Sequence, residues 1–191
     1  MQKALLVFRR LVLFCLLAPA LASASNFVSG STDAKVQILV FGDFQCPYTK
    51  TFMSYIPQLE QEYGETVGIK FAHFPLDFHP EAMNASVGAH CAGQQGEFRK
   101  YSELLFENQK KLNPSIYTEL AERAGIQNLF AFEKCRSTDQ AMATINDDKV
   151  LGRALAINGT PNIYINGYLV RGAYPIEHFK TIIDEQLKKP N

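Results

Sequence analysis

The chain has 191 residues, and its 19 basic side chains balance its 19 acidic ones, so the formal net charge is zero. Because no block of like charge occurs, the sequence excludes nucleic acid and an anionic membrane surface as expected partners. An apolar content of 47% provides for a sizeable core, and the length is that of one domain or of one domain with an insertion.

The N-terminus is typical of a bacterial secretory signal peptide. Basic residues precede a short apolar run over residues 11–21, which is followed by Ala-Ser-Ala at residues 22–24. The run is shorter than the roughly 20 apolar residues that a membrane span needs, so cleavage after Ala24 is favoured over a retained anchor. We therefore expect residues 1–24 to be removed on export to the periplasm, and the mature protein to have no stable membrane insertion.

The first predicted element of the mature chain is a buried strand over residues 36–41, which are nearly all apolar and often β-branched. A turn follows, and Cys46-Pro47 opens a helix, because proline is favourable at the first helical position. We expect Pro57 to kink or break this helix. A second strand is predicted over residues 67–74.

The next stretch, residues 80–157, has a helical pattern throughout, with a long helix predicted over 139–157. Gly159-Thr160-Pro161 ends that helix. Asn166-Gly167 between two short apolar runs is typical of a two-residue β-hairpin, and an amphipathic helix closes the chain. The order strand, helix, strand, helical block, hairpin, helix predicts an α/β fold with an all-helical insertion.

Cys46 is the residue that points most directly to chemistry. The positive end of a helix dipole stabilises a thiolate, which is the nucleophilic form of cysteine. Backbone amides near Thr49, together with its hydroxyl, are expected to donate hydrogen bonds to the same sulfur. A buried structural cysteine is the alternative that this local pattern leaves open.

A series of motifs occurs along the mature chain: Phe41-Gly42-Asp43-Phe44-Gln45-Cys46-Pro47-Tyr48, Phe74-Pro75-Leu76 with His79-Pro80, Cys91-Ala92 with Gln95-Gly96-Glu97-Phe98, Leu104-Leu105-Phe106, and Gly159-Thr160-Pro161. The first of them resembles the active-site segment of DsbA-like proteins of the thioredoxin superfamily, and the others follow in the order and spacing of that family. The resemblance covers about residues 36–187. It implies one domain over residues 25–191, with thioredoxin-fold parts at about 34–79 and 150–191 and a helical insertion at about 80–149.

The resemblance also implies roles for the site residues. Pro161 would follow a cis peptide bond and face Cys46. Thr160 would offer its backbone groups to an extended substrate, as in strand addition to a sheet edge. Pro47 and Tyr48 would contact the same substrate beside the cysteine.

Three positions depart from the family pattern. Thr49 replaces the second cysteine of the usual Cys-x-x-Cys, Val40 replaces a buried acid and leaves Asp43 as the nearest carboxylate, and Arg99 replaces a frequent aromatic residue. The first departure matters most, because Cys46 cannot then form a disulfide within a two-residue loop. We predict an enzyme that reduces or isomerises disulfides of secreted or periplasmic clients through one thiol, rather than a dithiol oxidant.

Cysteine pairing follows from the same comparison. Removal of residues 1–24 leaves Cys46, Cys91 and Cys135, and an oxidising compartment favours one pair and one free thiol. Cys91 and Cys135 both lie in the helical block, where some relatives carry a structural bridge. This bridge would close a loop of about 45 residues and, because it restricts the unfolded chain, would raise the free energy of unfolding by about 4 kcal/mol. A bond from Cys46 to one of them as a resolving partner is the alternative.

Two other functions stay open at this point. A glutathione-linked exchange would use glutathione as the partner of one thiol, and a membrane redox partner is a further candidate for regenerating Cys46. A peptide-binding or chaperone module would use the groove near Pro161 without catalysis. No cofactor is implied, and no metal site is predicted, because the spacing of the histidines and cysteines is not that of metal ligands.

Overall fold

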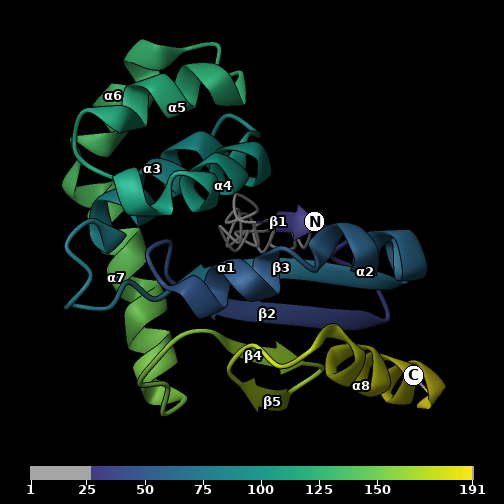
Figure 1. Cartoon of the computed structure of the whole chain (residues 1–191). Coiled ribbons are helices and arrows are strands. Elements are labelled where there is room, and N and C mark those ends of the chain that lie inside the picture. The colour runs from purple at the N-terminus through teal and green to yellow at the C-terminus, as the bar shows by residue number, and fades with distance from the viewer. Residues whose placement is uncertain (1–26, 191) are drawn as a thin grey trace, which may run out of the picture.

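A five-stranded sheet forms the centre of the computed structural model, which describes residues 27–190 (Figure 1). The strands are β1 (Phe27–Ser29), β2 (Val36–Gly42), β3 (Val67–His73), β4 (Asn162–Ile165) and β5 (Tyr168–Arg171), in the order β1-β3-β2-β4-β5 across the sheet. The central strand β2 runs parallel to β3 and antiparallel to β4. Because β2 has a neighbour on each side and layers on its faces, Val36, Ile38 and Val40 are fully buried.

The predicted signal peptide, residues 1–24, lies outside the described residues. Its cleavage after Ala24 and the export of the mature chain therefore stay predictions. Within residues 27–190, no helix is long and apolar enough to cross a lipid bilayer.

Three helices belong to the first and last parts of the fold: α1 (Pro47–Met53), α2 (Ile56–Tyr63) and α8 (Ile176–Lys188). The ring of Phe52 on α1 meets that of Phe179 on α8 edge-on, with centroids 4.9 Å apart. The predicted break near Pro57 separates α1 from α2 and lies at Ser54 and Tyr55. Pro57 itself sits in the first turn of α2, where its missing N–H costs no helical hydrogen bond.

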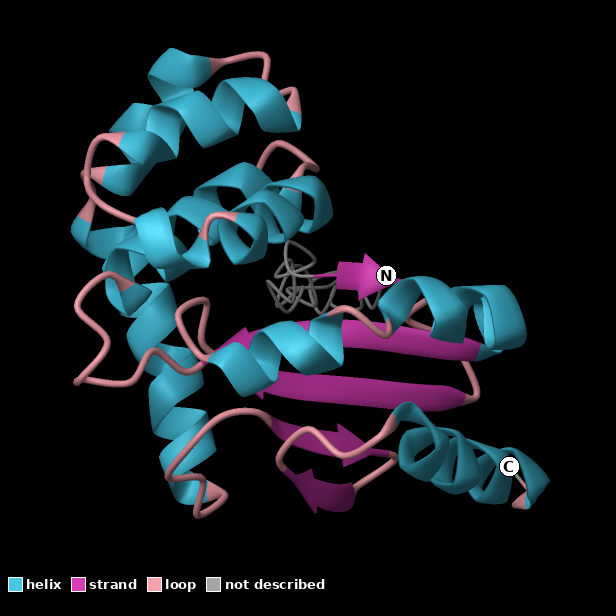
Figure 2. Ribbon diagram, viewed as in Figure 1, coloured by secondary structure: helices cyan, strands magenta, loops and turns pink. Residues whose placement is uncertain are grey.

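Five helices and one 3₁₀ turn lie between β3 and β4: α3 (Ala82–Gly93), α4 (Phe98–Glu107), η2 (Gln109–Lys111), α5 (Ile116–Ala124), α6 (Leu129–Arg136) and α7 (Asp139–Ala154). Figure 2 shows them stacked to one side of the sheet, with α7 running back past the end of the sheet toward β4. The Thr138 hydroxyl caps α7 by accepting the N–H of Ala141. α7 ends before the predicted residue 157, because Ala156 takes a positive φ of 56° and the Ile157 N–H returns to the Gly152 carbonyl.

The α/β fold with an all-helical insertion is therefore confirmed. β1 was not predicted from the sequence; it is a three-residue edge strand that pairs with β3 in an irregular register. A strand of three residues is too short to display the two-residue alternation by which strands are recognised.

His73 at the end of β3 is a buried histidine without a hydrogen-bond partner on either ring nitrogen. The rings of Phe44, Phe71 and Phe98 surround it, and its exposed fraction is 0%. Burial lowers the pKa of His73 from 6.5 to about 3, and the nearby His90 adds to the effect. The backbone N–H of His73 donates to Asp148 on α7 at 2.8 Å, and burial raises the pKa of that carboxyl from 3.8 to about 6.

These shifts predict a pH dependence of the free energy of unfolding. Between pH 6.5 and about 3 the unfolded chain binds a proton at His73 and the folded chain does not, so His73 costs stability as the pH falls. Asp148 acts in the opposite direction between pH 3.8 and about 6, where only the folded chain binds its proton. The two contributions oppose each other in the wild type between pH 3.8 and about 6, so the His73 contribution is measured as the difference from a His73→Phe variant. We expect that difference to grow by about 1.4 kcal/mol per pH unit in favour of the variant as the pH falls. Urea unfolding at a series of pH values measures it, and parallel curves for the two proteins would contradict the prediction.

Candidate active site

Cys46 is the N-cap residue of α1, between the end of β2 and Pro47. No acidic side chain lies in the first turn of this helix, so its unpaired N–H groups and dipole favour a negative charge there. Cys46 is 5% exposed, whereas Tyr48 two residues later is 64% exposed. The sulfur thus lies just below a surface formed by exposed neighbours.

The chain brings Thr160 and Pro161 to Cys46 from more than a hundred residues away. The Sγ of Cys46 donates to the backbone carbonyl of Thr160 at 3.2 Å. The peptide bond between Thr160 and Pro161 is cis, as the resemblance implies, and β4 begins at the next residue. Pairing of β4 with β2 determines this approach, because Phe41 near the end of β2 faces Asn162 at the start of β4.

Thr49 is fully buried one turn into α1. Its hydroxyl oxygen accepts the N–H of Asp43 at 3.4 Å, and its methyl group packs so closely on Gly42 that a Cβ there would lie 2.8 Å from it. The expected hydrogen bond from this hydroxyl to Cys46 is not present among the described residues. Thr49 therefore occupies the second-cysteine position as a buried packing residue with a polar contact to the turn.

Cys91 and Cys135 are joined by a disulfide between α3 and α6, with their Cα atoms 5.8 Å apart. Within residues 27–190, Cys46 is the free cysteine. The alternative in which Cys46 bonds to one of these two is therefore not the arrangement in this structure.

His79 contacts Asp43 across 36 residues of chain, a contact that the sequence pattern did not predict. The His79 Nδ1 atom lies 2.8 Å from Asp43 Oδ2, and the Asp43 side chain is 0% exposed. Gln109 was also missed: its Nε2 donates to the carbonyls of Phe44 at 2.8 Å and Cys46 at 3.0 Å. No local pattern reveals these contacts, because each partner comes from a different element.

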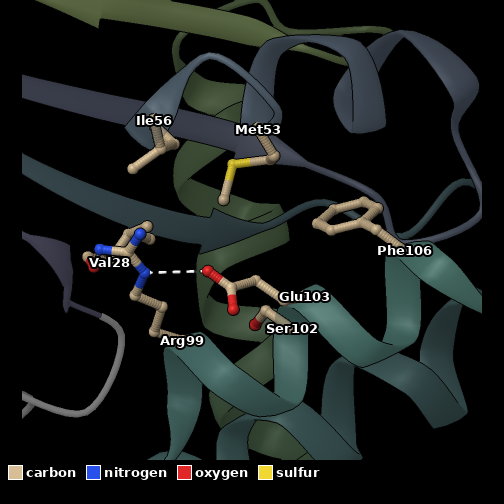
Figure 3. Close-up of a pocket in the computed structure, with 7 residues that line it drawn as sticks. All are labelled: Val28, Met53, Ile56, Arg99, Ser102, Glu103 and Phe106. Carbon is tan, nitrogen blue, oxygen red and sulfur yellow. Dashed lines mark hydrogen bonds and ion pairs between the residues drawn. The ribbon is translucent and has the colours of Figure 1, made fainter. Parts of the chain in front are cut away.

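Arg99, which departs from the family pattern, lies away from these residues. It joins α4 to α2 through Glu60 and to β1 through the carbonyl of Val28, and it also bonds to Glu103 within α4. Figure 3 shows it at the rim of a small pocket, whose lining residues are Val28, Met53, Ile56, Arg99, Ser102, Glu103 and Phe106. None of them is a predicted site residue. In the part of the chain that the structure describes, no group of three or more His, Cys, Asp or Glu side chains is arranged to hold a metal ion.

Comparison with known proteins agrees with this geometry. A family model described as Thioredoxin matches residues 23–185. The chain is 30% identical over 153 residues to a Na(+)/H(+) antiporter NhaA 1 of Salinispora arenicola, which covers 80% of this chain and 23% of that protein. It is 27% identical over 170 residues to a probable disulfide bond formation protein D of Bacillus cereus, which covers 84% of this chain and 78% of that protein.

The first curated relatives are much longer than the matched region, since the chain spans about a quarter of their length. A solved structure of oxidised BdbD from Bacillus subtilis superposes with a TM-score of 0.77 at 23% identity, covering 86% of this chain and 94% of that one. At that identity the likeness shows a shared fold. The family match covers most of the chain, and it agrees with the α/β fold with a helical insertion and with the cysteine at a helix start opposite a cis-proline. The chain therefore belongs to the thioredoxin family, with the fold of its DsbA-like members.

Proposed function

We propose that this protein is an exported thiol–disulfide exchange enzyme that acts on disulfides of periplasmic or secreted client proteins through Cys46 alone. The observation that carries the proposal is the 3.2 Å distance between the free Cys46 sulfur and the Thr160 carbonyl beside the cis-proline. The name of the Bacillus cereus relative, a probable disulfide bond formation protein, supports the same class of chemistry. The absence of a second thiol at position 49 supports isomerase or reductase activity over oxidation of clients.

The first step is attack of the Cys46 thiolate on a client disulfide. A new S–S bond forms between Cys46 and one client sulfur, and the second client sulfur leaves as a thiolate. The first turn of α1 provides N–H groups near the attacking sulfur. No electron is gained or lost overall, because one disulfide is exchanged for another.

The second step releases the client from Cys46. With Thr49 in place of a cysteine, the attacking thiol comes from elsewhere. If it is another cysteine of the client, the client leaves with a rearranged disulfide, which is isomerisation. If it is an external thiol such as glutathione, it bonds to Cys46 and the client leaves reduced. A second molecule of the external thiol then attacks this bond, which forms the disulfide of the external thiol and frees Cys46.

Client binding is proposed to use an extended segment of the client. Thr160 offers its backbone groups, and Pro161 shapes the turn beside them, as in strand addition. Pro47 and Tyr48 are exposed next to the sulfur, and the 64% exposed ring of Tyr48 provides an apolar contact for the client chain. A non-catalytic peptide-binding module would use the same surface, so only the chemistry separates the two functions.

Three assays of the mature protein test the proposal: insulin reduction with and without glutathione, refolding of scrambled ribonuclease, and isolation of a mixed disulfide with an insulin chain. We expect catalysis in at least one of the first two and a mixed disulfide at Cys46 in the third. A Cys46→Ala variant should fall to the uncatalysed rate, because the only nucleophile of the mechanism is removed. Insulin reduction that depends on glutathione identifies a reductase. Refolding of scrambled ribonuclease without glutathione identifies an isomerase. Binding of an unfolded peptide with no catalysis and no mixed disulfide would contradict the exchange function and support the binding module.

A further inference from the structure

Asp43 is the residue to which the turn before Cys46 is hydrogen-bonded. Its backbone carbonyl accepts the N–H of Cys46 at 3.1 Å, and its Oδ1 accepts the N–H of Gln45 at 2.7 Å. Its own N–H donates to Thr49 at 3.4 Å. The backbone N–H and carbonyl of Asp43 and one of its carboxylate oxygens therefore all form hydrogen bonds within residues 43–49, the segment that contains Cys46.

The other carboxylate oxygen, Oδ2, binds the loop between β3 and α3 (residues 74–81, the 74–81 loop). It accepts the backbone N–H of Leu76 at 2.8 Å and lies 2.8 Å from the Nδ1 of His79. The same loop is attached to the turn a second time, because the N–H of Glu81 donates to the Gln45 side chain at 2.6 Å. His79 therefore reaches Cys46 through Asp43 and not by a contact of its own.

The charge of this arrangement matters because the Asp43 side chain is fully buried. A buried carboxylate is costly unless it is paired, and an unpaired negative charge also disfavours a second negative charge nearby. His79 is the basic side chain in contact with Asp43, and it is 20% exposed, whereas the Asp43 side chain is fully buried. When His79 carries a proton the pair is neutral, and a thiolate at Cys46 meets no uncompensated negative charge from Asp43.

We propose that His79 is a positioning residue for Cys46, which acts through Asp43 by holding the active-site turn against the 74–81 loop and by neutralising the buried carboxylate three residues before the reactive cysteine. This inference rests on the proposed exchange function, since it concerns the reactivity of the same thiol.

Other charged groups on the surrounding elements have partners of their own. Asp77 in the 74–81 loop pairs with Lys149 on α7 at 2.8 Å. Glu81 before α3 accepts from the Tyr117 hydroxyl on α5 at 2.8 Å. Lys50 on α1 is exposed, so solvent screens its charge. Asp43 is therefore the fully buried carboxylate of this part of the described chain, and His79 is the basic side chain that contacts it.

The test is the rate at which iodoacetamide alkylates Cys46 across a series of pH values, with the label located at Cys46 by mass spectrometry. In a His79→Gln variant the amide keeps a hydrogen-bond donor but no positive charge, so the Asp43 carboxylate is uncompensated. The alkylation rate rises with pH and becomes constant once the thiol is fully ionised. Below that pH range, we expect alkylation of the variant to be about three- to tenfold slower than that of the wild type at the same pH. An Asp43→Asn variant removes the negative charge and should be faster than wild type. The double variant should return to within about twofold of wild type, because both charges are gone.

A matched control is His178→Gln, which removes an exposed histidine on α8 and should leave the alkylation profile unchanged. If His79 had a structural role alone, its replacement would lower the unfolding temperature and leave the pH dependence of Cys46 alkylation in the folded protein unchanged. That outcome would overturn the inference. If His79→Gln does not fold, equal or slower alkylation in Asp43→Asn would overturn it instead. A wild-type Cys46 that does not react in any pH range would contradict the proposed function itself, which separates the two failures.

Discussion

A Thr49→Cys variant is expected to oxidise client proteins, an activity that the wild-type protein lacks under the proposed single-thiol mechanism. Positions 46 and 49 lie at the N-cap and in the first turn of α1, and both side chains belong to the same turn. A cysteine at position 49 can attack a mixed disulfide at Cys46 from within the molecule. Such a thiol acts at an effective concentration far above that of a millimolar external thiol, so we expect client release to be about a hundredfold faster or more. Oxidative refolding of reduced ribonuclease by a stoichiometric amount of the oxidised variant measures the gain.

The structure suggests that the substitution is tolerated. Thr49 and cysteine are similar in volume, and the hydrogen bond lost from the Asp43 N–H is a long one, at 3.4 Å, worth about 1 kcal/mol. Thr51→Cys is the matched control, because it places a thiol on the exposed face of the same helix. If Thr49→Cys forms its disulfide and still shows no exchange with any client, the interpretation of this site as a disulfide-exchange scaffold is wrong.

Removal of the bridge between Cys91 and Cys135 is expected to lower the free energy of unfolding by about 4 kcal/mol. The two cysteines are 44 residues apart in sequence, so the bridge restricts a long segment of the unfolded chain. For a protein of this size, a loss of about 4 kcal/mol corresponds to a fall in melting temperature of roughly 8–16 °C. Thermal unfolding of a Cys91→Ala/Cys135→Ala variant, followed by circular dichroism, measures the effect.

The bridge lies between α3 and α6 in the helical block, and the proposed chemistry at Cys46 does not use it. Below its melting temperature, the double variant should therefore keep the exchange activity of the wild type. Dithiothreitol should lower the melting temperature of the wild type and leave that of the double variant unchanged. A variant that melts at the wild-type temperature would show that the restriction of the unfolded chain contributes little here.

Several features of the fold were predictable because they depend on local patterns. The strands β2 and β3, the hairpin at Asn166-Gly167 and the helix start at Cys46-Pro47 all lie where periodicity, turn residues or proline position indicate them. The break between α1 and α2 was predicted about two residues late, because proline is stable in the first turn of the helix that follows a break. The edge strand β1 was missed because three residues show no period.

The candidate site was predictable only in part. Cys46 and the turn at Thr160 and Pro161 carry recognisable motifs, and the structure brings them within hydrogen-bond distance. The partners of the turn are not revealed in the same way. His79 stands in one of the motifs of the resemblance, but nothing in that motif indicates a contact with Asp43, and Gln109 lies in a short 3₁₀ turn with no distinguishing pattern.

What the sequence by itself determined is the order of elements and the identity of the proposed nucleophile, Cys46, since hydrophobic periodicity and turn chemistry act over a few residues. Only the tertiary structure decided which distant groups surround that nucleophile. The Asp43 carboxylate is buried by the 74–81 loop and pairs with His79 there, and the Thr160 carbonyl reaches the sulfur because β4 pairs with β2. The physical reason is that the charge of a buried group and the hydrogen bonds of a turn depend on atoms that are close in space, whereas a local pattern reports only on atoms that are close along the chain.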